Sequence, residues 1–221
     1  AKMEKKTGKK WNSTKNPLLV SVRSGAAISM PGMMDTILNL GLNEKTVEGF
    51  AEQTKNPRFS WDSYRRFIQL FGKVVFGVND EKFDHVLDSA KEKQGVTDDS
   101  KLNVESLKKI VTEYKKICEE HTKRKFPDTP DEQLVLSIEA VFKSWMGERA
   151  IVYREKNNIT KDIANGTAVN VVTMVFGNMG DDSATGVVFT RNGHNGKKEI
   201  EGEYLINAQG EDVVAGVRTG K

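Results

Sequence analysis

The sequence predicts an α+β fold in which a block of helices lies between two segments that carry strands. Residues 16–41 are apolar, rich in glycine and sparingly charged, whereas residues 43–156 are charged, poor in glycine and apolar at helical spacing. From Gly166 to Arg218, valine, threonine and glycine dominate, which is typical of strands and turns. These changes divide the 221 residues into segments 1–42, 43–156 and 157–221.

The balance of charge and the lack of long apolar runs exclude several classes of partner. The chain carries 34 Lys and Arg residues against 31 Asp and Glu residues, so its formal net charge is only +3. Nucleic-acid-binding domains usually concentrate basic residues on one face. A membrane span needs ~18 uninterrupted apolar residues, which no window approaches. We therefore expect neither a nucleic acid nor a membrane as a partner.

A single cysteine, Cys118, restricts the covalent and metal chemistry of the chain. It excludes intrachain disulfides and cysteine-based zinc sites, and it fits a reducing compartment. The first residues also lack the apolar core of a secretory signal. We therefore expect a cytoplasmic protein, or an organellar one if the source is eukaryotic.

The first segment combines a strand with an apolar turn. Leu18–Val22 is a short run rich in strand-forming residues and predicts a buried strand, with Arg23-Ser24-Gly25 directly after it. Pro31-Gly32 then marks a turn inside the apolar stretch 29–34. We expect the methionines of this stretch to pack on the core.

Residues 43–156 are expected to form about five helices, because apolar residues recur three and four positions apart behind capping residues. The first four helices are predicted to begin near Asn43, Ser60, Asp80 and Asn103, and Gly95 is a natural end for the third.

The fifth helix has the strongest start signal. Thr129-Pro130-Asp131-Glu132 offers a cap, a proline at the first helical position and a glutamate at the capping-box position. The aromatic stripes of these helices are interpreted as core rather than as a cofactor site. The apolar face predicted for the fifth helix contains Leu134, Ile138, Val141, Phe142 and Trp145.

Three strands are expected in the last third of the chain. Residues 167–176 are almost wholly apolar, which is typical of a strand covered on both faces. Gly177–Gly180 would then turn the chain. Residues 186–190 and 200–207 would form two further strands, with Asn192-Gly193 and Asn195-Gly196 as hairpin-type turns between them.

Short motifs leave two candidate sites for chemistry. The three histidines are scattered, and the usual glycine-rich nucleotide fingerprints are absent. Arg23-Ser24-Gly25 remains, because the planar fork of an arginine can grip phosphate oxygens. Gly210-Glu211-Asp212 also remains, because carboxylates can orient Mg²⁺ or an arginine. From the residues alone, an ion pair or a simple turn is an equal alternative at each place.

Longer runs of sequence are more specific than these motifs. They are 17–25 (PLLVSVRSG), 29–42 (SMPGMMDTILNLGL), 56–59 (NPRF), 64–67 (YRRF), 149–154 (RAIVYR), 166–170 (GTAVN) and 202–216 (GEYLINAQGEDVVAG). In these runs the sequence resembles the pyruvate, phosphate dikinase family. The runs follow one another in the family's order and with family-like spacing over nearly the whole chain.

The resemblance implies that this chain is a piece of the family's N-terminal ATP-grasp nucleotide-binding domain, with an inserted helical subdomain. The family's enzyme also has a swivelling phosphohistidine domain and a barrel that binds pyruvate or phosphoenolpyruvate. It transfers the β-phosphoryl group of ATP to a histidine and the γ-phosphoryl group to inorganic phosphate. The histidine phosphate then passes to pyruvate, giving phosphoenolpyruvate, AMP and diphosphate.

The resemblance also assigns catalytic residues. Arg23 matches the arginine that contacts the phosphates of ATP and would supply a fixed positive charge there. Glu211 and Asp212 look like acidic residues of the same cleft, and they would orient the metal or neighbouring arginines. The prediction is that the Arg23 guanidinium faces this acidic pair across the cleft.

Further ATP-binding residues follow from the same resemblance. Glu203 looks like a third acidic residue of the cleft, and Arg66 resembles an arginine of the helical subdomain that faces it. Thr173, Met174 and Val175 match the strand whose backbone meets the edge of the adenine.

Other parts of the family's machinery are not in this sequence. The family's upstream Gly-Gly-Lys segment, its downstream Asp-x-Glu metal pair and Gln-x-Arg segment, and its phosphohistidine domain are missing. We therefore assign no metal ligand in this chain, expect Mg²⁺ only in the full enzyme, and expect the isolated chain to bind ATP poorly and transfer nothing. At Gly220-Lys221 the sequence also departs from the proline usual in the family.

The resemblance implies ATP, phosphate and pyruvate or phosphoenolpyruvate as partners of the full enzyme, which would be a homodimer. Two alternatives stay open. A dikinase of the phosphoenolpyruvate synthase type shares this chemistry but donates to water where the first uses phosphate. A helical protein-interaction module over residues 43–156 is the non-enzymatic alternative.

Overall fold

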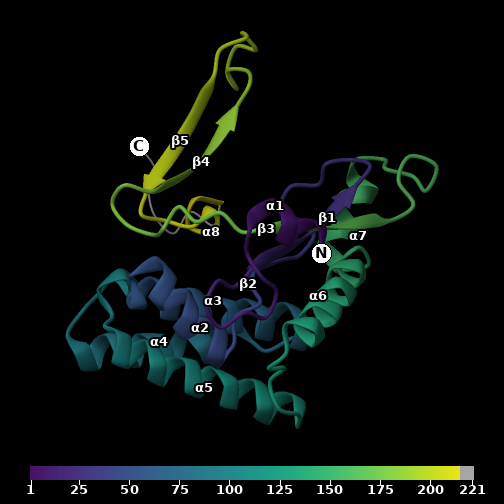
Figure 1. Cartoon of the computed structure of the whole chain (residues 1–221). Coiled ribbons are helices and arrows are strands. Elements are labelled where there is room, and N and C mark those ends of the chain that lie inside the picture. The colour runs from purple at the N-terminus through teal and green to yellow at the C-terminus, as the bar shows by residue number, and fades with distance from the viewer. Residues whose placement is uncertain (215–221) are drawn as a thin grey trace. The chain divides into compact units, whose positions relative to one another are not determined.

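The structure is a computed structural model that describes residues 1–214, so Gly220-Lys221 lies outside the described residues. It confirms the α+β class and divides into two compact units, the first of which is Ala1–Met174 and the second of which begins at Val175 (Figure 1). Most of the helices and a three-stranded sheet belong to the first unit, and a β-hairpin with a short helix belongs to the second.

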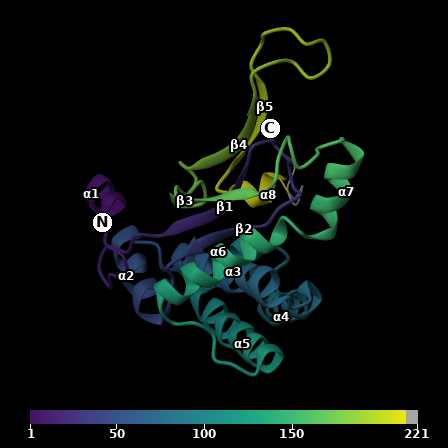
Figure 2. The same cartoon turned by 90° about the vertical axis from the view of Figure 1, so that its right-hand side faces the viewer.

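The sheet of the first unit has the order β2-β1-β3 and is antiparallel throughout. Its strands are β1 (Val20–Ala26), β2 (Thr36–Leu40) and β3 (Thr167–Thr173). α6 (Pro130–Ser144) contacts all three strands and α3 (Pro57–Phe76) contacts β2, and both helices lie beneath the strands in Figure 2. α3 and α6 therefore cover the face of the sheet that points downward in Figure 2.

The first strand lies further along the chain than the prediction of residues 18–22. β1 begins at Val20 and continues through Arg23 to Ala26, because its pairing with β3 extends as far as Ala26 opposite Thr167. Arg23 is therefore in the middle of a strand rather than at its end. The turn that follows is as predicted, with Met33 N–H donating to Met30 O at 3.1 Å and Met30 buried.

The prediction that residues 167–176 form a strand covered on both faces is wrong. β3 is an edge strand of this sheet among the described residues, and half-buried residues alternate along it with exposed ones. Val172, for example, is exposed. Apolar composition does not by itself reveal how many faces of a strand are covered.

Three of the predicted helix starts are confirmed, two of them with the expected asparagine as the capping residue. α2 (Glu44–Thr54) begins behind Asn43, whose side chain forms a capping box with Thr46. α4 (Asp80–Gln94) begins behind Asn79 and ends at Gly95, whose φ of 73° favours glycine. α5 (Val104–Thr122) begins behind Asn103, whose side chain accepts a hydrogen bond from Ser106 N–H.

The second predicted start, at Ser60, is wrong. α3 begins at Pro57, because the Asn56 side chain accepts a hydrogen bond from Phe59 N–H at 3.1 Å. Pro57 then occupies the first turn, where its missing N–H does no harm. Ser60 lies inside the helix and is buried.

α6 begins where predicted, but it turns a different face to the core. The Thr129 side chain caps it by accepting from Glu132 N–H at 3.3 Å. Of the predicted face, Val141 is buried, while the Phe142 side chain is 50 % exposed. Leu134, Ile138 and Trp145 are only half-buried. The buried residues of α6 are Pro130, Gln133, Ser137, Ala140, Val141 and Ser144.

The reason for this rotation is a set of buried hydrogen bonds from Gln133. Its Oε1 accepts from Gly41 N–H at 3.1 Å, and its Nε2 donates to Leu42 O and Pro127 O at 3.0 Å. These bonds satisfy backbone groups just after β2 and just before α6 that would otherwise be buried without partners. They keep the polar Gln133 side chain buried, while larger apolar residues of α6 such as Phe142 are exposed.

The remaining elements of the first unit were not predicted. They are α1 (Lys2–Thr7), a 3₁₀ turn η1 (Asp99–Lys101) and α7 (Glu148–Lys156).

The core of the first unit is aromatic, as the helical stripes predicted. Phe71 is fully buried, and its ring lies 5.4, 5.2 and 5.3 Å from those of Phe67, Phe76 and Phe126. The Cys118 thiol is also buried, and burial raises its pKa to about 12. It is therefore a core residue rather than a reactive one.

The second unit is a hairpin closed by a short helix. β4 (Ala184–Phe189) and β5 (Glu201–Ile206) are antiparallel, and α8 (Gly210–Val214) follows β5. The two strands confirm the predicted ones to within two residues. Leu205, Ala208 and Val213 form a small buried cluster, with Val187 partly buried against it.

Candidate functional site

Arg23 lies on the central strand of the sheet and points to the face opposite the core. Along β1, Val20 and Val22 are buried, whereas the Arg23 side chain is exposed. Its Nε donates to Ser21 Oγ at 3.3 Å, and that hydroxyl donates to Val172 O at 3.4 Å. The guanidinium is thus anchored to the sheet while remaining accessible to a ligand.

Arg66 lies on α3 and shares a carboxylate with its neighbour in sequence. Asp62 is one turn earlier, and its Oδ2 accepts from Arg66 Nε at 3.0 Å. Its Oδ1 accepts from Arg65 Nε and lies 2.8 Å from Arg65 Nη2. The Arg65 side chain is only 3 % exposed, while that of Arg66 is 20 % exposed. One buried carboxylate therefore holds a buried and a more accessible guanidinium.

The charge of Asp62 is stabilised by the arginines around it. Burial alone would raise the pKa of the Asp62 carboxyl. The guanidinium groups of Arg65 and Arg66, and then that of Arg58, outweigh burial and hold this pKa well below its usual range. Asp62 is consequently a carboxylate at every pH at which the protein would work.

A further set of contacts connects Asp62 and its arginines to the turn between α4 and α5. Arg65 Nη2 lies 3.6 Å from Asp99 Oδ2, and Arg58 Nη2 donates to Asp99 O at 2.9 Å. Lys91 Nζ approaches Asp99 Oδ1 at 3.5 Å. The arginines of α3 thus fasten η1 to the helix that carries Arg66.

The segment expected to meet the adenine spans the boundary between the two units. Thr173 pairs with Val20 at the end of β3, and Met174 N–H donates to Leu19 O at 2.9 Å. Met174 is buried, whereas the Val175 side chain is 91 % exposed. Val175 begins the second unit. The chain therefore leaves the sheet within this segment.

The three acidic candidates belong to the second unit. Glu203 lies on β5 opposite Val187 and is exposed. Glu211 is exposed in the first turn of α8. Asp212 is buried, and its Oδ2 accepts from Gln209 N–H at 2.9 Å, which closes the turn before α8.

The predicted residues thus fall into two groups. Arg23, Arg66, Thr173 and Met174 belong to the first unit, and the remaining candidates, Val175, Glu203, Glu211 and Asp212, belong to the second. That the Arg23 guanidinium faces the acidic pair Glu211 and Asp212 stays a prediction.

Sequence reasoning missed Asp62 and Arg65, although a signal was present. An acid followed three and four positions later by arginines is the spacing at which side chains meet on a helix. The run 64–67 directed attention to Arg66 alone.

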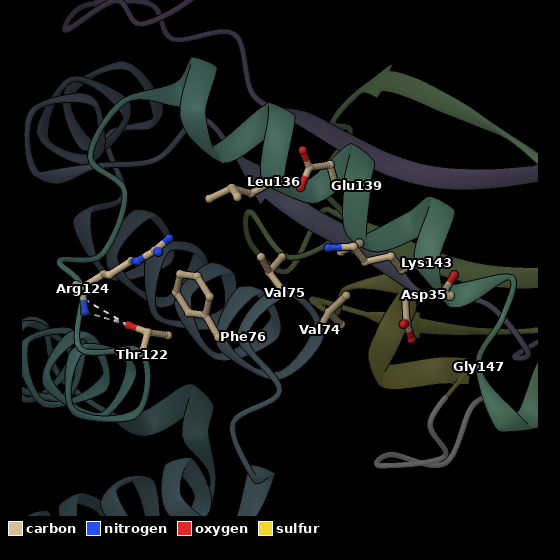
Figure 3. A pocket seen from close by; sticks show the side chains of 12 residues that line it. Asp35, Val74, Val75, Phe76, Thr122, Arg124, Leu136, Glu139, Lys143 and Gly147 are labelled. Carbon is tan, nitrogen blue, oxygen red and sulfur yellow. Dashed lines mark hydrogen bonds between the residues drawn. The ribbon is translucent and has the colours of Figure 1, made fainter.

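A separate pocket of the first unit has a volume of about 550 Å³ and opens between the ends of α3 and α5 and the side of α6 (Figure 3). Phe76 and Val75 belong to its apolar lining, and its charged lining is mixed, with Arg124 and Lys143 as well as the acidic Asp35 and Glu139. None of the described candidate residues lines this pocket.

Among residues 1–214 no group of three or more His, Cys, Asp or Glu side chains is arranged to hold a metal ion. Asp212 also uses one carboxylate oxygen for the backbone of Gln209. Within the same residues, no helix is long and apolar enough to cross a membrane.

Comparison with known proteins decides the family. Residues 1–220 match the family described as "Pyruvate phosphate dikinase, AMP/ATP-binding domain". The chain belongs to this family.

Curated members of the pyruvate, phosphate dikinase family are similar over almost the whole chain. The chain is 57 % identical to the pyruvate, phosphate dikinase of Entamoeba histolytica over 98 % of its length, which is 24 % of that protein. The enzyme of Clostridium symbiosum is also 57 % identical over 98 % of the chain and 25 % of its own length. Pyruvate, phosphate dikinase 1, chloroplastic, of Arabidopsis thaliana is 53 % identical over 98 % of the chain and 22 % of its own length. The chain spans about a quarter of these relatives.

Proposed function

We propose that this chain is the ATP-binding part of a pyruvate, phosphate dikinase. The whole enzyme would transfer the β-phosphoryl group of ATP to a histidine and the γ-phosphoryl group to inorganic phosphate. The histidine phosphate would then pass to pyruvate, with phosphoenolpyruvate, AMP and diphosphate as products. The family match over residues 1–220 carries this proposal, and relatives named for the reaction are 53–57 % identical.

In this proposal, Arg23 provides a fixed positive charge at the phosphates of ATP. Phosphoryl transfer depends mainly on positioning and on stabilising spread negative charge. A guanidinium suits this task because it stays charged and can bind two oxygens at once. Its anchoring to Ser21 on the central strand, together with its exposure, supports the assignment.

The other candidates would complete the nucleotide site. Arg66 would approach the phosphates from the helical segment, and the backbone of Thr173, Met174 and Val175 would meet the adenine. Glu203, Glu211 and Asp212 would line the same cleft. The exposed edge of β3 and the exposed positions of Glu203 and Glu211 support these roles.

Further features of the whole enzyme are proposed on the same basis. Mg²⁺ would accompany ATP, with its protein ligands outside this chain. Residues 1–42 and 157–221 would belong to the two ATP-grasp subdomains, and residues 43–156, which contain α2 to α7, would form the helical subdomain. The enzyme would be a homodimer in the cytoplasm or in an organelle.

The proposal is tested by Arg23→Leu in the whole enzyme. We expect phosphorylation of the enzyme by ATP to fall at least about a hundredfold, because a charge that acts on the transition state is lost. Transfer between the phosphorylated enzyme and pyruvate should be unchanged. Both half-reactions are measured with labelled substrates.

A matched control is Arg191→Leu, because Arg191 is an exposed arginine of the second unit outside the candidate site. It should leave both half-reactions unchanged. Equal loss of both half-reactions in Arg23→Leu would indicate misfolding, whereas unchanged phosphorylation by ATP would contradict the assignment.

A further inference from the structure

The carboxylate of Asp62 has a geometry that a simple ion pair does not need. A single arginine is enough to neutralise a buried aspartate. Asp62 instead divides its two oxygens, one bonded to Arg65 and the other to Arg66. Arg66 is the more accessible of the two guanidinium groups, and a guanidinium suits a site for phosphate.

The two arginines are held in different ways. Arg65 is nearly inaccessible and forms two contacts of 2.8 Å with Asp62 Oδ1. It also reaches Gln69 Oε1 at 3.2 Å. Arg65 and Asp62 therefore form a rigid pair within α3, and each keeps the other in place.

Arg66 bonds to the other oxygen of the same carboxylate, and the position of this contact matters. Asp62 Oδ2 bonds to Nε, at the base of the guanidinium next to the aliphatic chain. Arginines bind phosphate oxygens mainly with their terminal nitrogens. A restraint at Nε sets the plane of the guanidinium and thus the direction of those nitrogens. It also removes much of the rotamer freedom that binding would otherwise have to restrict.

We infer that Asp62 is a positioning residue for nucleotide binding, which orients the Arg66 guanidinium through Nε while Arg65 holds the carboxylate. This inference rests on the proposed function, because it needs Arg66 to contact the nucleotide. Asp62 itself touches no ligand. Its effect on ATP is exerted through Arg66.

The test is Asp62→Asn in the whole enzyme, analysed alone and together with Arg66→Ala. The asparagine keeps one acceptor but places an amide donor against a guanidinium, so Arg66 loses its orientation. We expect the KM for ATP to rise about tenfold, since misplacing a binding group by about an ångström has effects of this order or larger. The KM for pyruvate should not change.

The double variant separates a positioning role from a general loss of structure. If Asp62 acts through Arg66, Asp62→Asn raises the KM for ATP no further once Arg66 is alanine. Asp99→Asn is the matched control, because Asp99 belongs to the same network through its contact with Arg65. It should leave the KM for ATP within twofold.

The outcomes distinguish the inference from the function on which it rests. If Arg66→Ala raises the KM for ATP and Asp62→Asn does not, the inference is wrong and the function stands. The inference is also wrong if Asp62→Asn raises this KM equally with and without Arg66. If Arg66→Ala has no effect, the nucleotide role of Arg66 fails and the inference fails with it.

A second variant covers the case in which Asp62→Asn does not fold. Asp62→Glu keeps the negative charge between the arginines but moves the carboxylate by one methylene. We expect a folded protein in which the KM for ATP is at least about threefold higher, again only when Arg66 is present. An unchanged KM in folded Asp62→Glu would overturn the inference.

Discussion

The two units of this chain differ in how much apolar side-chain surface they bury. The first unit has fully buried aromatic and aliphatic side chains from several helices and from the sheet. The second has a small buried cluster of Leu205, Ala208 and Val213, while Phe189 is 59 % and Ile200 83 % exposed. The described part of the second unit, a hairpin and a short helix, buries little apolar area and is therefore weakly stabilised.

The two units also support buried charge differently. The first unit keeps Asp62 and Arg65 inside, because each is compensated by good hydrogen bonds. In the second unit the candidate acids Glu203 and Glu211 are exposed, whereas Asp212 is buried and accepts a hydrogen bond from Gln209 N–H. The first unit thus compensates a buried aspartate with arginines, and the second compensates one with a backbone group.

The largest difference in the free energy of unfolding is expected between two phenylalanine-to-alanine variants, one in each unit. Phe71→Ala should lower the free energy of unfolding by about 4 kcal/mol, because it leaves a cavity among packed rings. Phe189→Ala removes a mostly exposed ring of β4 and should cost less than about 1 kcal/mol. Urea unfolding followed by circular dichroism measures both. Similar losses in the two variants would break the comparison.

A smaller effect is expected from the buried charge of the first unit. At pH 7, Asp62→Asn should lower the free energy of unfolding by about 3 kcal/mol, because it deprives the buried Arg65 of its closest counter-ion. The pKa of Asp62 is lowered in the folded state, so the stabilisation is complete above the unfolded pKa of about 4. It is lost as the pH falls below that value.

Urea unfolding of the parent chain and of Asp62→Asn between about pH 7 and pH 3 measures this dependence. The difference between the two free energies should be constant at higher pH and shrink below about pH 4. Glu199→Gln, which changes an exposed acid of the second unit, serves as the control and should alter stability by less than about 0.5 kcal/mol. A difference that grows on acidification would contradict a lowered pKa of Asp62 in the folded state.

The smallest effect is a local one in the second unit. Leu205→Ala should weaken that unit by about 2 kcal/mol, the lower end for a buried leucine, because its cluster is small. Amide hydrogen exchange should become faster in β4 and β5 and stay unchanged in α3 and α5. Equal acceleration in both units would mean that they unfold together, and the contrast drawn above would not hold.

The accuracy of the sequence predictions followed the range of the interactions involved. Asn43, Asn103 and Thr129 were recognised as caps because a cap bonds to backbone groups two or three residues away. Ser60 failed as a cap because Asn56 and Pro57 supply a better start one turn earlier.

Longer-range features were harder to predict. The face that α6 buries depends on Gln133 reaching backbone groups about 90 positions away in sequence, which no helical periodicity records. β3 was taken as covered on both faces because apolar composition says nothing about neighbouring strands. The site residues came from the resemblance, and the contact of Asp62 with Arg66 became visible only in the structure.

The order and type of most helices and strands, and membership of the dikinase family, were contained in the sequence itself. Helical spacing, caps and long specific runs are properties of neighbouring residues, and they survive without any knowledge of packing. Which face of α6 is buried, that Arg23 stands in the middle of a strand, and that one carboxylate serves two arginines were decided by tertiary structure. These features depend on which backbone and charged groups need partners once the core has formed, and such partners come from distant parts of the chain.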